Sequence, residues 1–110
     1  MPSQGGVPVI DGQRFKEEVI PHKGLAIVAF SATWCGPCRI QANILKELMS
    51  EVGSDILIRK VDIDQASDLG ASLNIMSVPT LFIYRDGDVL HRKIGVSNLK
   101  ELRKFLQQFA

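Results

Sequence analysis

The sequence predicts an α/β domain in which a central mixed sheet of five strands is flanked by four helices. Strand-like and helix-like segments alternate along the chain, as they do when helices pack on a sheet. The run Leu25–Phe30 is apolar throughout, which is typical of a strand buried on both faces. The pair Asp86-Gly87 separates the last two strand-like segments and predicts a hairpin. We therefore expect parallel strands early in the sheet and an antiparallel pair late.

The first half of the chain is expected to form two strands and two helices. Residues 7–10 are a candidate short strand, and Asp11 is a candidate N-cap for a short helix that ends at Pro21. After the buried strand, apolar residues recur at helical spacing and predict a long amphipathic helix that Gly53 ends. The apolar positions of that helix are Ile40, Ile44, Leu45, Leu48, Met49 and Val52.

The second half is expected to form three strands and two helices. The predicted strands cover residues 56–61, 80–84 and 89–94, and a short helix is expected near 69–75. Asn98, with Glu101 three residues later, resembles a capping box and predicts the start of a C-terminal helix. The buried stripe of this helix is expected to consist of Leu99, Leu102, Leu106 and Phe109.

Length and composition indicate one globular domain. The chain has 110 residues, of which 45% are hydrophobic and 23% charged. A domain of this size exceeds the roughly 40 residues below which disulfides are usually needed for stability. Residues 1–8 are rich in Gly, Pro and Ser and are interpreted as a flexible arm before a domain over 9–110.

The charge pattern and the N-terminal segment indicate which classes of partner and which compartment to expect. The net charge is +1, and no run of five or six like charges occurs, so neither a nucleic-acid nor a membrane partner is predicted. The N-terminal segment lacks a basic region followed by an apolar one, which favours a cytoplasmic location. In a reducing compartment, a close cysteine pair is more often catalytic or metal-binding than structural.

Two cysteines, Cys35 and Cys38, stand three positions apart where the strand 25–30 gives way to the long helix. Unpaired N–H groups and the helix dipole favour a thiolate at a helix N-terminus, and the thiolate is the attacking species in disulfide exchange. Cys38, one turn further, is close enough to attack a mixed disulfide formed at Cys35. Pro37 suits the first helical turn, and Gly36 leaves an open approach for a substrate sulfur.

A metal site and a purely structural disulfide are the alternatives for these cysteines. His22 and His91 are the only histidines, and neither has the spacing to the cysteines that a zinc site would need. We therefore predict a redox pair and no metal.

The segment Phe30–Cys38 resembles the active-site segment of thioredoxins, and the likeness extends over about residues 9–110. Further segments that match the family are Val61–Asp64, Val78–Thr80, Asp86-Gly87 and Ile94-Gly95. The resemblance implies the thioredoxin fold and a protein disulfide reductase that works through a redox disulfide between Cys35 and Cys38.

The resemblance also implies the surroundings and the partners of the dithiol. Pro79 is expected to be cis and to sit against the two cysteines, although cis X–Pro bonds are uncommon. The implied partners are disulfide-containing client proteins and thioredoxin reductase or an equivalent reductase, which supplies the electrons. The protein is expected to be a monomer and to bind no cofactor. The residues expected to line the client groove are Trp34, Gly36, Pro37, Val78 and Gly95.

Ala29 and Lys60 bear on how a proton moves to and from the dithiol. Ala29 stands where the family usually carries a buried Asp that helps move a proton to or from the second cysteine. Lys60 matches a family lysine close to that Asp, and an unpaired buried ammonium is unfavourable. Lys60 is therefore expected either to reach solvent or to favour a nearby thiolate by its charge.

The leading interpretation leaves other functions open. Ala29 gives some weight to a non-catalytic module that binds partners in the same groove, whereas the intact cysteine pair argues against it. A client-specific reductase or redox chaperone uses the same chemistry on fewer partners. An oxidase or isomerase would differ in redox potential, and the Gly36-Pro37 pair resembles the reducing members of the superfamily.

Overall fold

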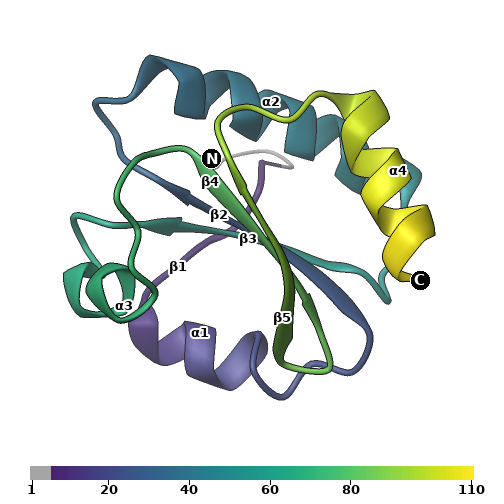
Figure 1. Cartoon of the computed structure of the whole chain (residues 1–110), viewed down its shortest axis with the longest axis horizontal. Helices are drawn as coiled ribbons and strands as arrows, with labels where there is room; N and C mark the ends of the chain where they lie inside the picture. Colours follow the sequence, from purple (N-terminus) through teal and green to yellow (C-terminus); the bar gives the residue numbers. More distant parts are fainter. Residues whose placement is uncertain (1–5) are drawn as a thin grey trace.

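A computed structural model describes residues 6–110 and shows one five-stranded sheet in the order β1-β3-β2-β4-β5 (Figure 1). β3 runs parallel to β1 and β2, while β4 is antiparallel to β2 and β5. The predicted mixed sheet, with its late antiparallel hairpin, is confirmed. The strands are β1 (Val9–Ile10), β2 (Leu25–Ser31), β3 (Leu57–Asp62), β4 (Thr80–Arg85) and β5 (Asp88–Ile94).

Helices cover both faces of this sheet. In Figure 1 one face carries α1 and α3, and the other carries α2 and α4. Two apolar layers, one on each side of the sheet, make up most of the core. The predicted fold class, a five-stranded mixed sheet with four helices, is confirmed. The helices are α1 (Gly12–Glu18), α2 (Gly36–Glu51), α3 (Ser67–Ser72) and α4 (Leu99–Phe109).

β2 is the central strand, and all seven of its residues are buried. Successive side chains of a strand point to opposite faces, so every position of a central strand needs an apolar or well-paired residue. Val28 and Phe30 pack in the layer of α1, whereas Ile27 and Ala29 pack in the layer of α2 and α4. Burial on both faces explains the unbroken apolar run in the sequence and fixes the strand that leads into the cysteine pair.

The predicted helix starts and hairpin turn are present. The Asp11 carboxylate accepts the Arg14 N–H at 2.8 Å and caps α1. At α4, the Asn98 side chain accepts the Glu101 N–H at 2.9 Å, and the Glu101 side chain accepts the Asn98 N–H at 3.2 Å. The backbone of Asp86 and Gly87 has φ values of 52° and 87°, as a tight hairpin turn requires.

The predicted flexible arm over 1–8 needs correction at its C-terminal end. Residues 1–5 lie outside the described residues. Val7, however, is only 8% exposed and packs in the layer of α2 and α4. The Pro8 carbonyl accepts the Lys60 N–H at 2.9 Å. Because the apolar Val7 side chain gains by burial and Pro8 extends the pairing of β1 with β3, the packed structure begins before residue 9.

The predicted apolar face of α2 is partly wrong. Ile40 is 56% exposed, whereas Gln41 is 1% exposed. A helix repeats every 3.6 residues, so a stripe drawn at a strict spacing of four drifts off the buried face. The residues of α2 that are buried are Cys38, Gln41, Leu45 and Leu48.

Tyr84 is expected to make the stability of the fold depend on pH. Its side chain is 2% exposed, its hydroxyl has no hydrogen-bond partner within residues 6–110, and burial raises the pKa of this phenol. Tyrosine in the unfolded chain ionises near pH 10. Because the folded pKa is the higher one, the contribution of Tyr84 to stability is complete below that pH and is lost above it.

We predict that Tyr84→Phe makes the protein less sensitive to alkali. Urea unfolding of the native chain and the variant, measured at neutral pH and above pH 10, checks this. The variant is expected to be about as stable at neutral pH or more stable by about 1 kcal/mol, because a buried hydroxyl without a partner is unfavourable. Lysine titration is common to both proteins and cancels in the comparison. An equal loss of stability in both proteins above pH 10 would contradict the prediction.

Candidate active site

The cysteine pair lies at the start of the longest helix. Cys35 is the N-cap of α2, with extended backbone, and α2 runs for 16 residues from Gly36. The Cys38 N–H donates to Cys35 Sγ over 3.2 Å. An N–H directed at the sulfur, together with the positive end of the helix dipole, favours the Cys35 thiolate over the thiol.

Cys35 and Cys38 are joined as a disulfide, with Cα atoms 5.3 Å apart. The expected proximity of the two sulfurs is therefore confirmed. Each cysteine is 5% exposed, while Gly36 and Pro37 between them are exposed. Pro37 occupies the first turn of α2, where no helical N–H is lost. The pair thus lies just below a surface formed by small or compact residues.

The loop before β4 contacts the dithiol, and the segment after β5 is hydrogen-bonded to that loop. The Val78-Pro79 bond is cis, as expected, and the Val78 carbonyl oxygen lies 3.8 Å from Cys35 Sγ. The Gly95 N–H donates to the Pro79 carbonyl at 2.9 Å, which ties the segment after β5 to the loop before β4. Gly95 has a φ of 91°, a conformation that suits glycine. Val78, Pro79 and Gly95 are therefore brought together near Cys35.

Trp34 is 69% exposed beside Cys35, and its indole N–H donates to the Asp64 carboxylate at 2.9 Å. Asp64 is not among the site residues that the sequence predicts. The sequence order nevertheless indicates that Asp64 and Trp34 lie close together. Asp64 comes shortly after β3, and Trp34 comes shortly after β2, which ends at Ser31 and pairs in parallel with β3. Residues that follow parallel neighbouring strands meet at the same edge of the sheet. Asp64 thus orients the indole ring over this edge.

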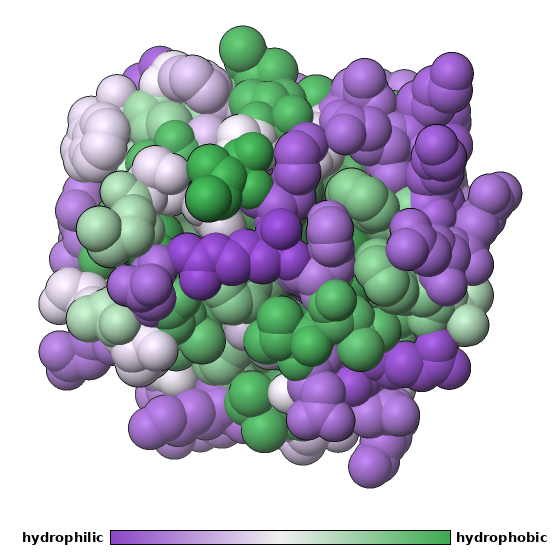
Figure 2. Space-filling model, viewed as in Figure 1, coloured by the Kyte–Doolittle hydropathy of each residue, from purple (hydrophilic) through white to green (hydrophobic). Residues whose placement is uncertain are grey.

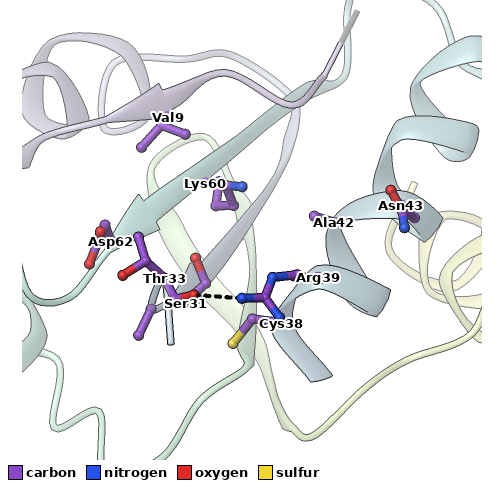
Figure 3. Close-up of a pocket in the computed structure, with 10 residues that line it drawn as sticks. Val9, Ser31, Thr33, Cys38, Arg39, Ala42, Asn43, Lys60 and Asp62 are labelled. Carbon is purple, nitrogen blue, oxygen red and sulfur yellow. Dashed lines mark hydrogen bonds between the residues drawn. The ribbon is translucent and has the colours of Figure 1, made fainter. Parts of the chain in front are cut away.

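A pocket of ≈ 510 Å³ lies on the inner side of Cys38, between the start of α2 and the edge formed by β1 and β3 (Figure 3). Lys60 reaches into it from β3, and Asp62 stands on the same strand. Arg39 closes another side and donates to the Thr33 carbonyl at 3.2 Å. Cys38, although only 5% exposed, is one of the residues that line this pocket. The complete lining is Val9, Ser31, Ala32, Thr33, Cys38, Arg39, Ala42, Asn43, Lys60 and Asp62.

Ala29 and Lys60 are direct neighbours across β2 and β3. Ala29 is 2% exposed and contributes only a methyl group to the layer under α2. Lys60 is half-buried, and its ammonium forms no salt bridge within residues 6–110. The expectation that Lys60 reaches solvent is consistent with its position on the pocket wall.

No group of three or more His, Cys, Asp or Glu side chains in the described part of the chain is arranged to hold a metal ion. None of the helices described is long and apolar enough to cross a bilayer. What the geometry does provide is a dithiol at a helix N-terminus, with its first sulfur favoured as a thiolate and its second within bonding distance. This fold and this site define a thiol–disulfide oxidoreductase of the thioredoxin type.

Comparison with known proteins agrees with the fold and the site. A family profile described as Thioredoxin matches residues 6–108. A thioredoxin of Listeria monocytogenes is 37% identical over 103 residues, which is 94% of this chain and 98% of that protein. A thioredoxin of Bacillus subtilis is 33% identical over 96 residues, 87% of this chain and 90% of its own length. The chain belongs to the thioredoxin family.

A solved structure supports the fold independently. A single-site mutant of a thioredoxin from Halobacterium salinarum superposes with a TM-score of 0.85, covering 99% of this chain and 95% of that one, at 23% sequence identity. The matching family profile and the thioredoxin relatives, together with the Cys35–Cys38 pair, show that the chain is a protein disulfide reductase of this family. The roles expected for Lys60 and for the groove residues Trp34, Gly36, Pro37, Val78 and Gly95 stay predictions.

Proposed function

We propose that this protein reduces disulfides in client proteins and is restored by an external reductase, a thioredoxin reductase or an equivalent, without a bound cofactor of its own. The observation that carries the proposal is the Cys35–Cys38 disulfide at the N-terminus of α2. A pair that can cycle between dithiol and disulfide stores two electrons, so the chemistry needs no further group in the protein.

The reaction follows from thiol–disulfide exchange. The Cys35 thiolate attacks one sulfur of the client disulfide, the client S–S bond breaks, and the other client sulfur leaves as a thiolate that takes up a proton. Cys38 then loses its proton and attacks Cys35 Sγ in the mixed disulfide. The second client sulfur leaves, and the Cys35–Cys38 bond forms. Two electrons have passed from the dithiol to the client.

The exposed surface around Cys35 suits an extended segment of a client. Trp34 is 69% exposed and Met76, two residues before Val78, is 82% exposed, so both offer apolar contact. Pro79 has no N–H, and the Val78 backbone beside it is the candidate partner for the client's main chain. On the face seen in Figure 2, apolar residues form separate areas divided by hydrophilic side chains. We further propose that the protein is a monomer.

The proposed location is the cytoplasm. A reductant that must be kept as a dithiol functions where glutathione or thioredoxin systems maintain reducing conditions. Relatives named simply as thioredoxins from Listeria monocytogenes and Bacillus subtilis support this proposal.

Reduction of insulin by dithiothreitol tests the proposed activity. The protein is expected to accelerate precipitation of the insulin B chain in proportion to its concentration. No acceleration by the correctly folded, fully reduced protein would contradict a general reductase and favour the binding-module alternative that Ala29 suggested.

Deprotonation of Cys38 is the step in which this chain is expected to be unusual. Ala29 supplies no carboxylate, so we propose that the proton leaves to solvent through the pocket beside Cys38, and that the Lys60 charge favours the resulting thiolate. A step that depends on solvent accelerates as rising pH increases the thiolate fraction.

We predict that Ala29→Asp changes the pH profile of this resolving step. A carboxylate that acts as general base typically contributes about 10²-fold or more, so the variant should be faster than the native protein near neutral pH, with the gain falling as pH rises. Single-turnover reduction of a disulfide client across the range of thiol titration measures this. Ala29→Asn is the matched control, because it adds a side chain of the same shape with no ionisable group. Superimposable profiles for all three proteins would refute a role for position 29.

A further inference from the structure

A buried amide joins the dithiol helix to the loop that follows β5. Gln41 lies one turn after Cys38 and is 1% exposed. Its Nε2 donates to the Ser97 carbonyl at 3.1 Å, and its Oε1 accepts the Ser97 N–H at 2.7 Å. Ser97 is itself fully buried and is 56 residues away in sequence. Both polar atoms of the Gln41 amide are therefore hydrogen-bonded to the backbone of a single residue, Ser97.

This contact closes a chain of interactions around the dithiol. From Ser97 the backbone runs back two residues to Gly95, whose N–H donates to the Pro79 carbonyl at 2.9 Å. Pro79 follows Val78, whose carbonyl lies 3.8 Å from Cys35 Sγ. The path then returns through Cys35 and α2 to Gln41. The helix α2, the loop before β4 and the loop after β5 are thus linked, and Gln41 supplies the link between α2 and the loop after β5.

A positioning role explains why an amide occupies a site that packing alone would give to an apolar residue. Gln41 shares the buried side of α2 with Leu45 and Leu48. Burying an amide is unfavourable unless its donor and its acceptor are both paired. Here both are paired with backbone groups, so the contact fixes the position of the Ser97 main chain relative to α2.

We propose that Gln41 is a positioning residue that sets the distance between the dithiol helix and the Gly95 side of the client groove. The inference rests on the proposed reduction of protein clients, because only a ligand that spans both loops senses that distance. In the predicted groove, a protein client would contact Val78 and Gly95 as well as Cys35. A small disulfide such as hydroxyethyl disulfide needs only the Cys35 sulfur.

Gln41→Met tests this, because methionine has nearly the same length and shape and forms neither hydrogen bond. We expect KM for insulin to rise about tenfold, the order expected when paired hydrogen bonds that hold a loop are lost, while the rate with hydroxyethyl disulfide changes less than twofold. In amide hydrogen exchange, the Ser97 N–H should lose protection in the variant. Gln41→Glu keeps an acceptor for the Ser97 N–H and should recover part of the insulin KM.

Leu48→Ala is the matched control for a general loss of stability. Leu48 is fully buried on the same helix, two turns beyond Gln41 and outside the stretch of α2 that joins Cys35 to Gln41, and its truncation is expected to cost about 2–5 kcal/mol. Assayed where it is folded, this variant should keep both activities. An equal fall in both activities for Gln41→Met, or no change in either, overturns the proposal. If native protein fails to reduce insulin but reduces hydroxyethyl disulfide, the proposed function fails instead, and the Ser97 exchange measurement still tests the link.

Discussion

Replacing Cys35 by serine is expected to abolish catalysis, so that insulin is reduced only at the rate of dithiothreitol alone. A thiolate forms readily near neutral pH, and the N–H of Cys38 and the helix dipole favour it further, whereas a serine hydroxyl stays protonated and does not open a disulfide. Because Cys35 is N-cap of α2 and serine is a good N-cap residue, Cys35→Ser should fold normally. The loss of activity would therefore result from the missing thiolate and not from unfolding.

The matched control for this loss is Glu47→Ala, at an exposed position of the same helix. It should keep native activity, since the side chain lies more than two turns of α2 away from Cys38. Residual activity in Cys35→Ser well above the background rate would show that another group, such as Cys38, opens the client disulfide. That result would contradict the assignment of Cys35 as nucleophile.

Replacing Cys38 by serine is expected to stop the reaction half-way. Cys35 still attacks the client, but no second thiol lies within reach of the mixed disulfide, since Cys35 and Cys38 are the only cysteines. A covalent adduct of protein and client should accumulate to nearly one equivalent, and mass spectrometry under non-reducing conditions measures it. Excess dithiothreitol should release the Cys38→Ser protein with a free Cys35 thiol and the client in its reduced, dithiol form.

Two controls make this result specific. The native protein, which resolves the intermediate, should show little adduct under the same conditions. The double variant Cys35→Ser/Cys38→Ser should show none. An adduct that forms equally in the double variant, or that fails to form in Cys38→Ser, would contradict the two-step exchange.

Much of the fold follows from local patterns in the sequence. The buried run at 25–30, the cap at Asp11, the capping box at Asn98 and the turn at Asp86-Gly87 each depend on a few adjacent residues, and each is present in the structure. The cysteine pair is similarly local, because three residues of helix place the two sulfurs close together.

Two features that depend on contacts distant in sequence were not predicted. The hydrogen bond from Trp34 to Asp64 requires the parallel register of β2 and β3. The pairing of Gln41 with Ser97 requires α2 and the loop after β5 to meet. Gln41 also explains why the predicted buried face of α2 differs from the observed one. A polar residue at a buried position interrupts the apolar pattern from which the face is predicted, and only its distant hydrogen-bond partner explains its burial.

The chemistry proposed here depends on a reactive anion at Cys35, and alkylation of the reduced protein with iodoacetamide measures this most directly. The rate at each cysteine, followed by mass spectrometry as a function of pH, should show Cys35 reacting first. Its apparent pKa should lie below the value of about 8.5 for an unperturbed thiol. Preferential alkylation of Cys38, or a midpoint for Cys35 at or above that ordinary value, would contradict the account.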